Sequence, residues 1–159
     1  DKNETELSKS HDTEGLFYDK DRDLLLIACK AEEDDYYGYR TVFGLTPDDK
    51  DIERKPFLLI DEEDLIERLH IRYGNRLGSS FKPSGLARHP QNGDLYVLSA
   101  ANSLLAVFDE NQDMKEILRL SYPHTNQMEG ICFAPDGTLF ISSEGGTGKI
   151  AVFKKYMDE

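Results

Sequence analysis

The sequence predicts an all-β protein built from β-propeller blades, each a sheet of four antiparallel strands. A small polar or acidic residue, a glycine, an apolar residue, a polar turn and a strand-like run follow one another in residues 14–29, 84–99 and 129–143. The equivalent glycines are Gly15, Gly85 and Gly130. They are 70 and 45 residues apart. One blade takes about 40–45 residues, so the second separation matches a blade and the first leaves about 25 residues for an insertion.

The clearest copy of the motif is the segment 128–146, which predicts two short apolar strands joined by a tight turn. The turn is Pro135-Asp136-Gly137: proline presets φ, aspartate can bond its own backbone, and glycine accepts a positive φ. The flanking residues alternate or run apolar, as is typical of half-buried strands. This segment is therefore expected to be the inner hairpin of a blade.

The first blade is expected over residues 13–76 and contains the insertion. After the first strand of the motif, its strands are an apolar run at 24–28, a run rich in Tyr, Val and Phe at 36–45, and a fourth run at 57–60. A short helix is predicted over 62–71, outside the sheets. It begins with an acidic N-cap and an acidic first turn, and it carries one apolar stripe at helical spacing.

The second blade, at 77–125, is predicted to be a complete four-stranded meander, and the third, at 126–159, ends one strand short. Residues 1–12 are either a frayed end or a short outer strand. Closed propellers have about four to eight blades, so three are too few. We therefore expect residues 1–159 to be a single partial propeller domain with an open blade edge, which closed propellers complete with a strand from the other chain end.

The composition argues against several classes of function. The net charge of −12 argues against nucleic-acid binding, which needs a basic surface, and is compatible with cation binding. No run of 18 apolar residues occurs, so no membrane span is predicted. The chain begins at Asp1, and we expect a processed or trimmed product whose targeting segment was removed. Cys29 and Cys132 lie in apolar strand sequence and are expected to be buried, with a disulfide as the alternative.

Three blocks of the sequence, 13–30, 81–99 and 129–146, resemble in this order the SdiA-regulated (YjiK-like) family, and the similarity covers most of residues 13–155. NHL and gluconolactonase-like propellers share the Glu-Gly and Pro-Asp-Gly-x-Leu pieces. The resemblance implies a six-bladed propeller, of which this chain is about the C-terminal half. It also implies an extracytoplasmic location, periplasmic or at the cell surface, with a membrane or lipoprotein-type anchor. The biochemical activity of this family is not defined.

Three carboxylates are candidate metal ligands: Glu14 and Glu129 precede the glycine of their repeats, and Glu144 ends an inner strand. Carboxylates that converge on a channel repel unless they are protonated or bind a cation, and hard oxygen ligands suit Ca²⁺ or Mg²⁺. The resemblance to gluconolactonase-like propellers supports such a channel cation. The alternative is structural, with the Glu-Gly carboxylate bonded to backbone N–H groups of a neighbouring blade. Ser84 departs from the pattern, and the acidic run 32–35 is either a solvated turn or a surface cation site.

Other polar residues lie near the same strand ends. Asn102 and Asn126 are either turn residues or sources of neutral oxygen ligands. His11 and His124 precede Glu-Gly entries, which gives them a route to the channel. His89 occupies the turn position and is expected to be a turn residue.

Two functions fit these features, together with a third, purely structural role. The first is a non-enzymatic binding or scaffold propeller that holds a small ligand or a protein at its channel mouth, with Ca²⁺ as a candidate bound cation and no organic cofactor. The alternative is a metal-dependent lactonase or esterase, in which a channel cation polarises a carbonyl and activates water. That enzyme needs a metal and a general base in one mouth, and Glu144 or His124 is the candidate base. Fold alone does not choose between these functions.

Overall fold

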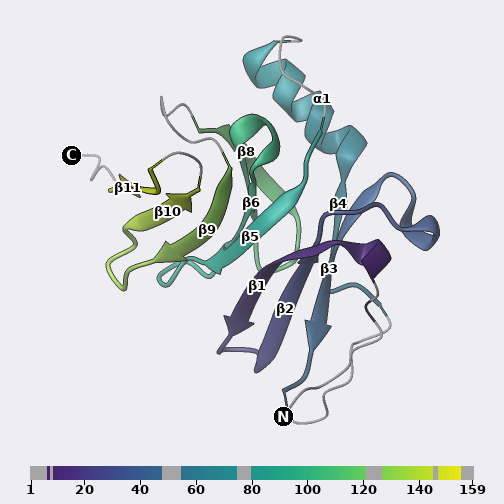
Figure 1. Cartoon of the computed structure of the whole chain (residues 1–159), viewed down its shortest axis with the longest axis horizontal. Coiled ribbons are helices and arrows are strands. Elements are labelled where there is room, and N and C mark those ends of the chain that lie inside the picture. The colour runs from purple at the N-terminus through teal and green to yellow at the C-terminus, as the bar shows by residue number, and fades with distance from the viewer. Residues whose placement is uncertain are drawn as a thin grey trace. The chain divides into compact units, whose positions relative to one another are not determined.

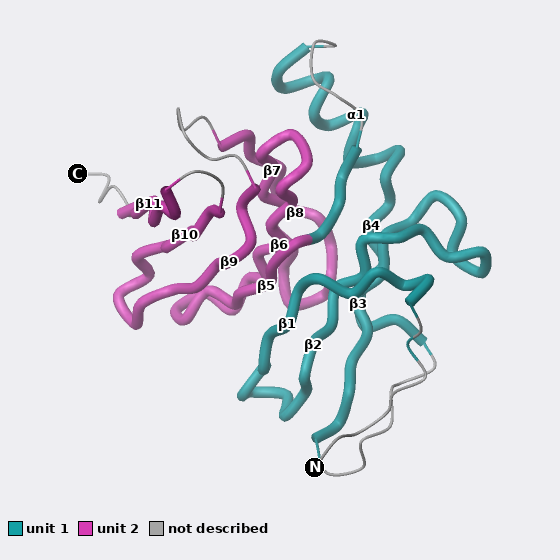
Figure 2. Tube along the Cα trace, viewed as in Figure 1, with its two compact units in different colours: residues 1–83 teal, residues 84–159 magenta. Residues whose placement is uncertain are grey.

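The computed structural model describes residues 7, 9–47, 55–74, 80–120, 127–144 and 147–154. Strands dominate, and the described part contains one α-helix (Figure 1). The chain divides into two compact units, Asp1–Pro83 and Ser84–Glu159 (Figure 2). Each unit is described by itself below. The prediction of a single domain over 1–159 remains a prediction.

The first unit holds a four-stranded antiparallel sheet in the order β1-β2-β3-β4. Its strands are β1 (Thr13–Asp19), β2 (Leu24–Cys29), β3 (Tyr39–Leu45) and β4 (Leu58–Asp61). The third strand was predicted from residue 36 but begins at Tyr39, because Asp34–Tyr36 forms a short 3-10 helix. Another short 3-10 helix, Lys9–His11, precedes β1, whereas most of the N-terminal segment lies outside the described residues. The meander of the first blade is confirmed.

Helix α1 (Glu62–Tyr73) follows β4 directly and confirms the predicted helix. The Asp61 carboxylate accepts hydrogen bonds from the backbone N–H groups of Glu63 and Asp64, at 2.9 and 3.2 Å, and so caps the first turn. The helix extends two residues beyond the predicted end and stops at Gly74, whose φ of 76° suits glycine. Leu65 and Leu69 are its buried residues.

Arg40 on β3 joins three segments of the first unit. Its guanidinium lies 2.9 Å from the Glu62 carboxylate at the helix start and donates to the Phe81 carbonyl at 3.0 Å. The side chain is buried, and Nη1 has no hydrogen-bond partner among the described residues, although the Glu32 carboxylate is 3.8 Å away. This charge-paired contact fixes the insertion against the sheet.

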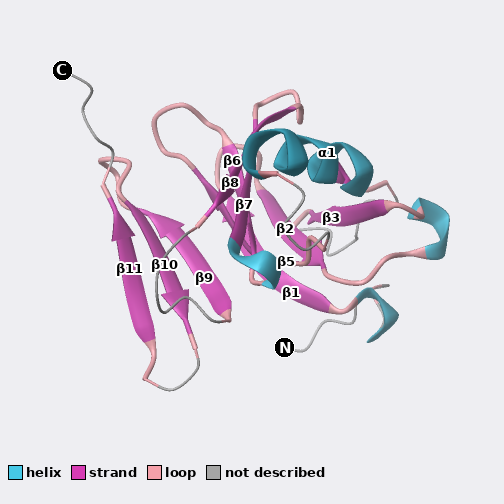
Figure 3. Ribbon diagram, turned by 90° about the horizontal axis from the view of Figure 1, so that it is seen from above, coloured by secondary structure: helices cyan, strands magenta, loops and turns pink. Residues whose placement is uncertain are grey.

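The second unit contains two further antiparallel sheets. The first has the order β5-β6-β7-β8, made of β5 (Pro83–Arg88), β6 (Leu95–Ser99), β7 (Leu104–Phe108) and β8 (Met114–Arg119). The other has the order β11-β10-β9, made of β9 (Met128–Phe133), β10 (Leu139–Ser143) and β11 (Lys149–Phe153), which lie side by side in Figure 3. Among the described residues the last sheet has three strands, and the predicted bounds of the blades remain a prediction.

The two sheets of the second unit enclose its core. The buried members are Leu98, Leu105, Met128, Leu139 and Ile141, and half-buried apolar side chains from both sheets surround them. Burying an aliphatic side chain of this size contributes about 1.5–3 kcal/mol, so this layer is a main source of stability for the unit.

His89 closes the turn after β5, as predicted, but its ring is buried rather than solvated. Nδ1 accepts hydrogen bonds from the backbone N–H groups of Gln91 and Asn92, at 3.3 and 3.4 Å. The ring packs edge-on against Phe133, with centroids 4.9 Å apart. A Cβ on Gly137 would lie 3.1 Å from Nε2, so glycine lets the two turns approach closely. His89 is therefore a packing residue between the two sheets.

The two cysteines differ. Cys29 is buried, as predicted, whereas Cys132 is exposed, and neither forms a disulfide. The prediction of a buried Cys132 was wrong because β9 is apolar on both faces, while only the face carrying Ile131 and Phe133 packs against the neighbouring sheet. An apolar run identifies a strand but not which of its faces is covered.

Candidate functional site

The candidate site lies at the end of each sheet where its first strand begins. At that end stands the residue that precedes the equivalent glycine of the repeat. We call Glu14, Ser84 and Glu129 the entry residues. The pairing of β1 with β2 shifts by one residue between Thr13 and Gly15, and the pairing of β9 with β10 shifts at the corresponding place. Glu14 and Glu129 are therefore each the extra residue of a β-bulge. Bulges redirect a side chain and occur often beside functional sites.

Ser84 is buried, and its side chain forms hydrogen bonds with backbone groups. Its hydroxyl donates to the Met128 carbonyl at 2.8 Å and accepts from the Ala100 N–H at 3.2 Å. These contacts tie β5 to the start of β9 and to the end of β6. The entry residue of the middle repeat therefore has a structural role. This is the role that the sequence also allowed for Glu14 and Glu129, as hydrogen-bond partners of a neighbouring blade's backbone.

Close packing beside Ser84 explains the glycine that follows it. A Cβ on Gly85 would lie 3.0 Å from the Ile131 side chain and 3.3 Å from the Glu129 carbonyl oxygen. Because the second contact is with backbone, a rotamer change cannot relieve it. The small entry glycine therefore sets the distance between β5 and β9.

Glu14 lies in the first unit and forms an ion pair. Lys30, just after β2, places its ammonium 3.0 Å from the Glu14 carboxylate and 3.9 Å from that of Asp12. A hollow of about 250 Å³ adjoins this group and is lined by Leu7, Thr13, Glu14, Gly15, Leu16 and Ile27. A cation at Glu14 would have to compete with Lys30.

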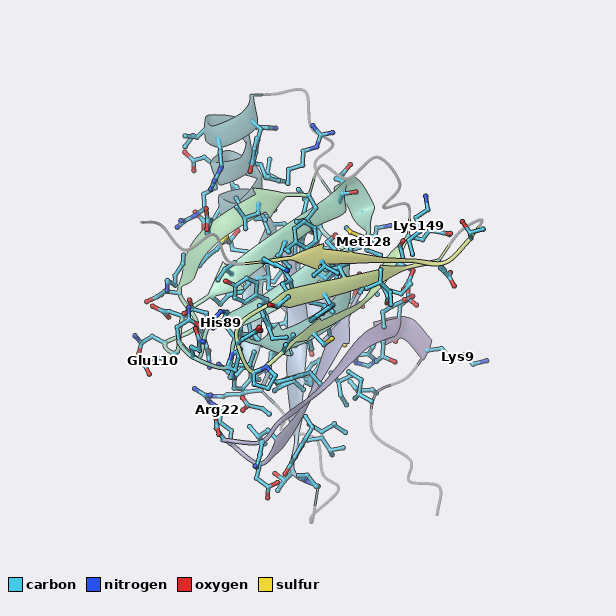
Figure 4. The ribbon with its side chains drawn as sticks, turned by 90° about the vertical axis from the view of Figure 1, so that its left-hand side faces the viewer. Lys9, Arg22, His89, Glu110, Met128 and Lys149 are labelled. Atoms are coloured by element: carbon cyan, nitrogen blue, oxygen red, sulfur yellow. The ribbon has the colours of Figure 1, made fainter. Side chains whose placement is uncertain are left out.

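Glu129 and Glu144 are both exposed and lie at the same end of sheet β9–β11. Ser143 on β10 pairs with Met128 on β9, and the Glu144 N–H donates to the Gln127 carbonyl at 3.0 Å. Glu129 and Glu144 are thus the neighbours of this pair at the end where β9 begins and β10 ends. Figure 4 labels Met128 and Lys149 toward this end of the sheet and His89 toward the other. The structure thus brings two of the three predicted ligands to one sheet end, and Glu14 belongs to the other unit.

Within the described ranges, no three His, Cys, Asp or Glu side chains are grouped so that they could hold a metal ion. The predicted metal site remains a prediction. His124 and Asn126, considered as further contributors, lie outside the described residues. Asn102 has a φ of 61° in the short 3-10 helix Ala101–Ser103, consistent with a turn residue.

The acidic run 32–35 forms a second polar hollow, of about 350 Å³, in the first unit. It is lined by Ser10, His11, Glu32, Glu33, Asp34 and Asp35. Glu33 accepts a 2.6 Å hydrogen bond from the Thr41 hydroxyl and lies 3.6 Å from His11 Nε2. Glu32 accepts from the Gly38 N–H at 2.7 Å. Two of these carboxylates therefore order the loop, and the approach of His11 was not predictable because it comes from a different segment.

Burial raises the pKa of the Cys29 thiol to about 11, although a hydrogen bond with Thr41 partly offsets the effect. The Cys29 thiol stays protonated near neutral pH, and a protonated thiol is a poor nucleophile. Cys29 is therefore a packing residue and not a candidate catalytic group.

Repeated antiparallel sheets with their strands in sequence order define a β-propeller-type protein. A family model confirms the resemblance read from the motifs. The model of the SdiA-regulated family matches residues 3–147, and this chain belongs to that family. Comparison with curated proteins gives no match. No helix among the described residues is long and apolar enough to cross a membrane.

Solved structures show the same fold at low identity. The chain is similar to a putative 6-phosphogluconolactonase from Bacteroides uniformis, with 12% identity and a TM-score of 0.58, covering 92% of this chain and 38% of that one. A nidogen/laminin complex gives 13% identity and a TM-score of 0.55, covering 90% and 44%. A luciferin-regenerating enzyme gives 12% and 0.55, covering 82% and 37%. The chain thus spans less than half the length of these structures, and at such identity the likeness shows the fold alone.

Proposed function

We propose that this protein is a non-catalytic binding propeller whose ligand-facing surface is the entry end of its blades. The observation that carries the proposal is the pair of β-bulges at Glu14 and Glu129. Two sheets have an extra, bulged residue at the same position of the repeat, and in both sheets that residue is a glutamate. A purely structural entry needs no such carboxylate, because Ser84 makes the backbone contacts of the middle sheet with a hydroxyl.

The ligand we propose for the last sheet is a divalent cation, Ca²⁺ above all. Glu129 and Glu144 are exposed at one sheet end and supply the hard oxygen donors that Ca²⁺ prefers, while backbone carbonyls, water or a bound molecule complete the 6–8 ligands. Glu14 is the equivalent candidate in the first unit, where a cation has to displace Lys30. The net charge of −12 favours the approach of a cation.

Thermal unfolding with millimolar Ca²⁺ and with EDTA tests this proposal. An ion that binds only the folded state must raise the midpoint, so we expect a rise with Ca²⁺ that is lost in Glu129→Gln and in Glu144→Gln. Glu110→Gln is the matched control, because Glu110 is an exposed glutamate in the turn between β7 and β8, outside the entry end. No rise in the unsubstituted protein, or a rise that persists in both entry variants, would contradict the cation site.

The alternative function, a metal-dependent lactonase or esterase, uses the same carboxylates and is separated by the same variants. A screen of lactones and aryl esters with Ca²⁺ present would support it if hydrolysis appears and disappears with Glu129→Gln. The likeness to a putative 6-phosphogluconolactonase concerns the fold and does not decide this point. We also propose the extracytoplasmic location that the family resemblance implies. Fractionation of cells that express the full gene tests it, and recovery in the cytoplasm would contradict it.

A further inference from the structure

The turn between β5 and β6 is built around the imidazole of His89, which accepts hydrogen bonds from the backbone. Nδ1 lies 3.3 Å from the backbone nitrogen of Gln91 and 3.4 Å from that of Asn92, and both N–H groups donate to it. A neutral imidazole has one protonated nitrogen and one acceptor nitrogen, so the proton of His89 is on Nε2. An imidazolium carries a proton on both nitrogens and accepts no hydrogen bond. The closed turn therefore requires a neutral His89.

The ring of His89 is enclosed between the two sheets of the second unit, and the residue is only 7% exposed. Its centroid lies 4.9 Å from that of Phe133 on β9 and 6.2 Å from that of Tyr96 on β6. Burial raises the pKa of the Tyr96 hydroxyl, so this neighbour is uncharged near neutral pH. Burial among such side chains disfavours a charged group. The packing of the ring and the hydrogen bonds of the turn thus favour the same neutral state.

Charged side chains of the elements packed around the ring have partners of their own. The Asp94 carboxylate, just before β6, lies 2.8 Å from the Lys115 ammonium on β8. The Asp136 carboxylate, in the turn between β9 and β10, accepts from the Thr138 N–H at 2.9 Å, which lowers its pKa. The Arg88 guanidinium on β5 donates to a backbone carbonyl of the β5–β6 turn. These partners hold the two carboxylates whether or not the imidazole is protonated, and the two cations oppose a further positive charge.

Gln91 connects the β5–β6 turn to the neighbouring sheet. Its backbone N–H donates to His89 Nδ1, and its side-chain amide donates to the Asp136 carbonyl at 3.3 Å. Glycine at position 137 lets the β9–β10 turn lie close to the ring, because a Cβ there would be 3.1 Å from Nε2 and 3.5 Å from the Gln91 side-chain oxygen. Loss of the Nδ1 acceptor would therefore release the residue that joins the two turns.

We propose that His89 is an acid-sensitive latch between the two sheets of the second unit. The neutral ring holds the β5–β6 turn against the β9–β10 turn, and protonation in mildly acidic solution opens this contact. A histidine in an unfolded chain has a pKa of about 6.5, so below that pH the unfolded chain binds a proton that the closed turn excludes. The contribution of the latch to stability is therefore complete above about pH 6.5 and is lost as the pH falls. The latch follows the end of β5 and Ser84 lies near its start, so this inference is independent of the proposed cation site.

Nuclear magnetic resonance of the full chain tests the latch without any substitution. At about pH 8 the imidazole nitrogens of His89 should show a neutral ring with its proton on Nε2. As the pH is lowered toward about 5, the ring should take up a proton only together with a shift of the Gln91 and Asn92 amide signals from their folded positions. A ring with its proton on Nδ1 at about pH 8 would overturn the proposal. So would a ring that titrates while both amide signals keep their positions.

Two substitutions separate the acceptor from the proton. His89→Asn places an amide oxygen near the position of Nδ1, so it can accept from the two N–H groups but does not titrate. Urea unfolding should show that the unfolding equilibrium constant of the unsubstituted chain rises, relative to that of His89→Asn, by about tenfold for each pH unit below about 6. His89→Gln carries its amide farther from the backbone, removes the acceptor and should be less stable than His89→Asn at every pH.

His70→Gln is the matched control, because it removes an imidazole from α1, away from this turn. It should keep the acid-dependent rise of the unsubstituted chain. Equal pH dependence in the unsubstituted chain and in His89→Asn would overturn the proposal. If His89→Asn does not fold, the titration of the unsubstituted chain by magnetic resonance decides.

Discussion

Ser84 and Glu129 occupy equivalent entry positions but use their side chains differently. The Ser84 hydroxyl is buried and bonded to backbone on two sides, whereas Glu129 lies exposed on a bulge. An ionised carboxylate buried in the place of Ser84 would cost several kcal/mol unless paired. The middle repeat therefore keeps a small hydroxyl for packing, whereas the carboxylate of Glu129 lies at the exposed surface of its bulge.

The two thiols give a residue-scale prediction. At about pH 8, near the ordinary cysteine pKa, a thiol-specific reagent should modify Cys132 rapidly in the folded, dilute protein. Cys29 should react only on unfolding, because it is buried and its raised pKa keeps it protonated. Timed labelling followed by mass spectrometry distinguishes the two, and Cys132→Ser should remove the fast phase. Equal rates for both thiols would mean that β2 opens readily.

The raised pKa of Cys29 predicts that the protein becomes less stable at high pH. Between the ordinary thiol pKa of 9.0 and the folded-state pKa of about 11, unfolded chains lose the Cys29 proton while folded chains keep it. The unfolded state then binds fewer protons, so the contribution of this thiol to stability is complete below pH 9.0 and is lost as pH rises toward 11.

At the scale of the element, helix α1 depends on its first turn. Asp61→Ala removes the acceptor for two backbone N–H groups and should lower the free energy of unfolding by about 1 kcal/mol. Urea unfolding measures this as a lower midpoint at an unchanged slope. Asp61→Asn is the control, because asparagine caps equally well. If both variants lost the same stability, the charge of Asp61 and not its hydrogen bonds would be responsible.

Elements with local signals were predictable from the sequence. The acidic N-cap marked the start of α1, and Pro135-Asp136-Gly137 marked the turn between β9 and β10, because both signals act within a few residues. The contact of Arg40 with the Phe81 carbonyl joins positions 41 residues apart, and no local pattern announces it. The candidate site was likewise predictable only in part. The sequence repeat identified Glu14 and Glu129, but their β-bulges depend on how the strands pair, which the sequence does not show.

At the scale of the whole molecule, the net charge of −12 acts on folding. Like charges lie closer together in the compact chain than in the unfolded one, so their repulsion lowers the free energy of unfolding. Salt screens this repulsion, whereas the apolar burial that stabilises the sheets stays in place. The balance between the two therefore depends on ionic strength.

The free energy of unfolding should accordingly rise as salt rises. The Debye length falls from about 30 Å at 0.01 M to about 10 Å at 0.1 M, so long-range repulsion within the chain weakens across this range. Urea unfolding at these two ionic strengths measures the change as a shift of the midpoint at an unchanged slope. Stability that falls with salt would show that ion pairs such as that of Arg40 with Glu62, and not the net charge, dominate the electrostatics of folding.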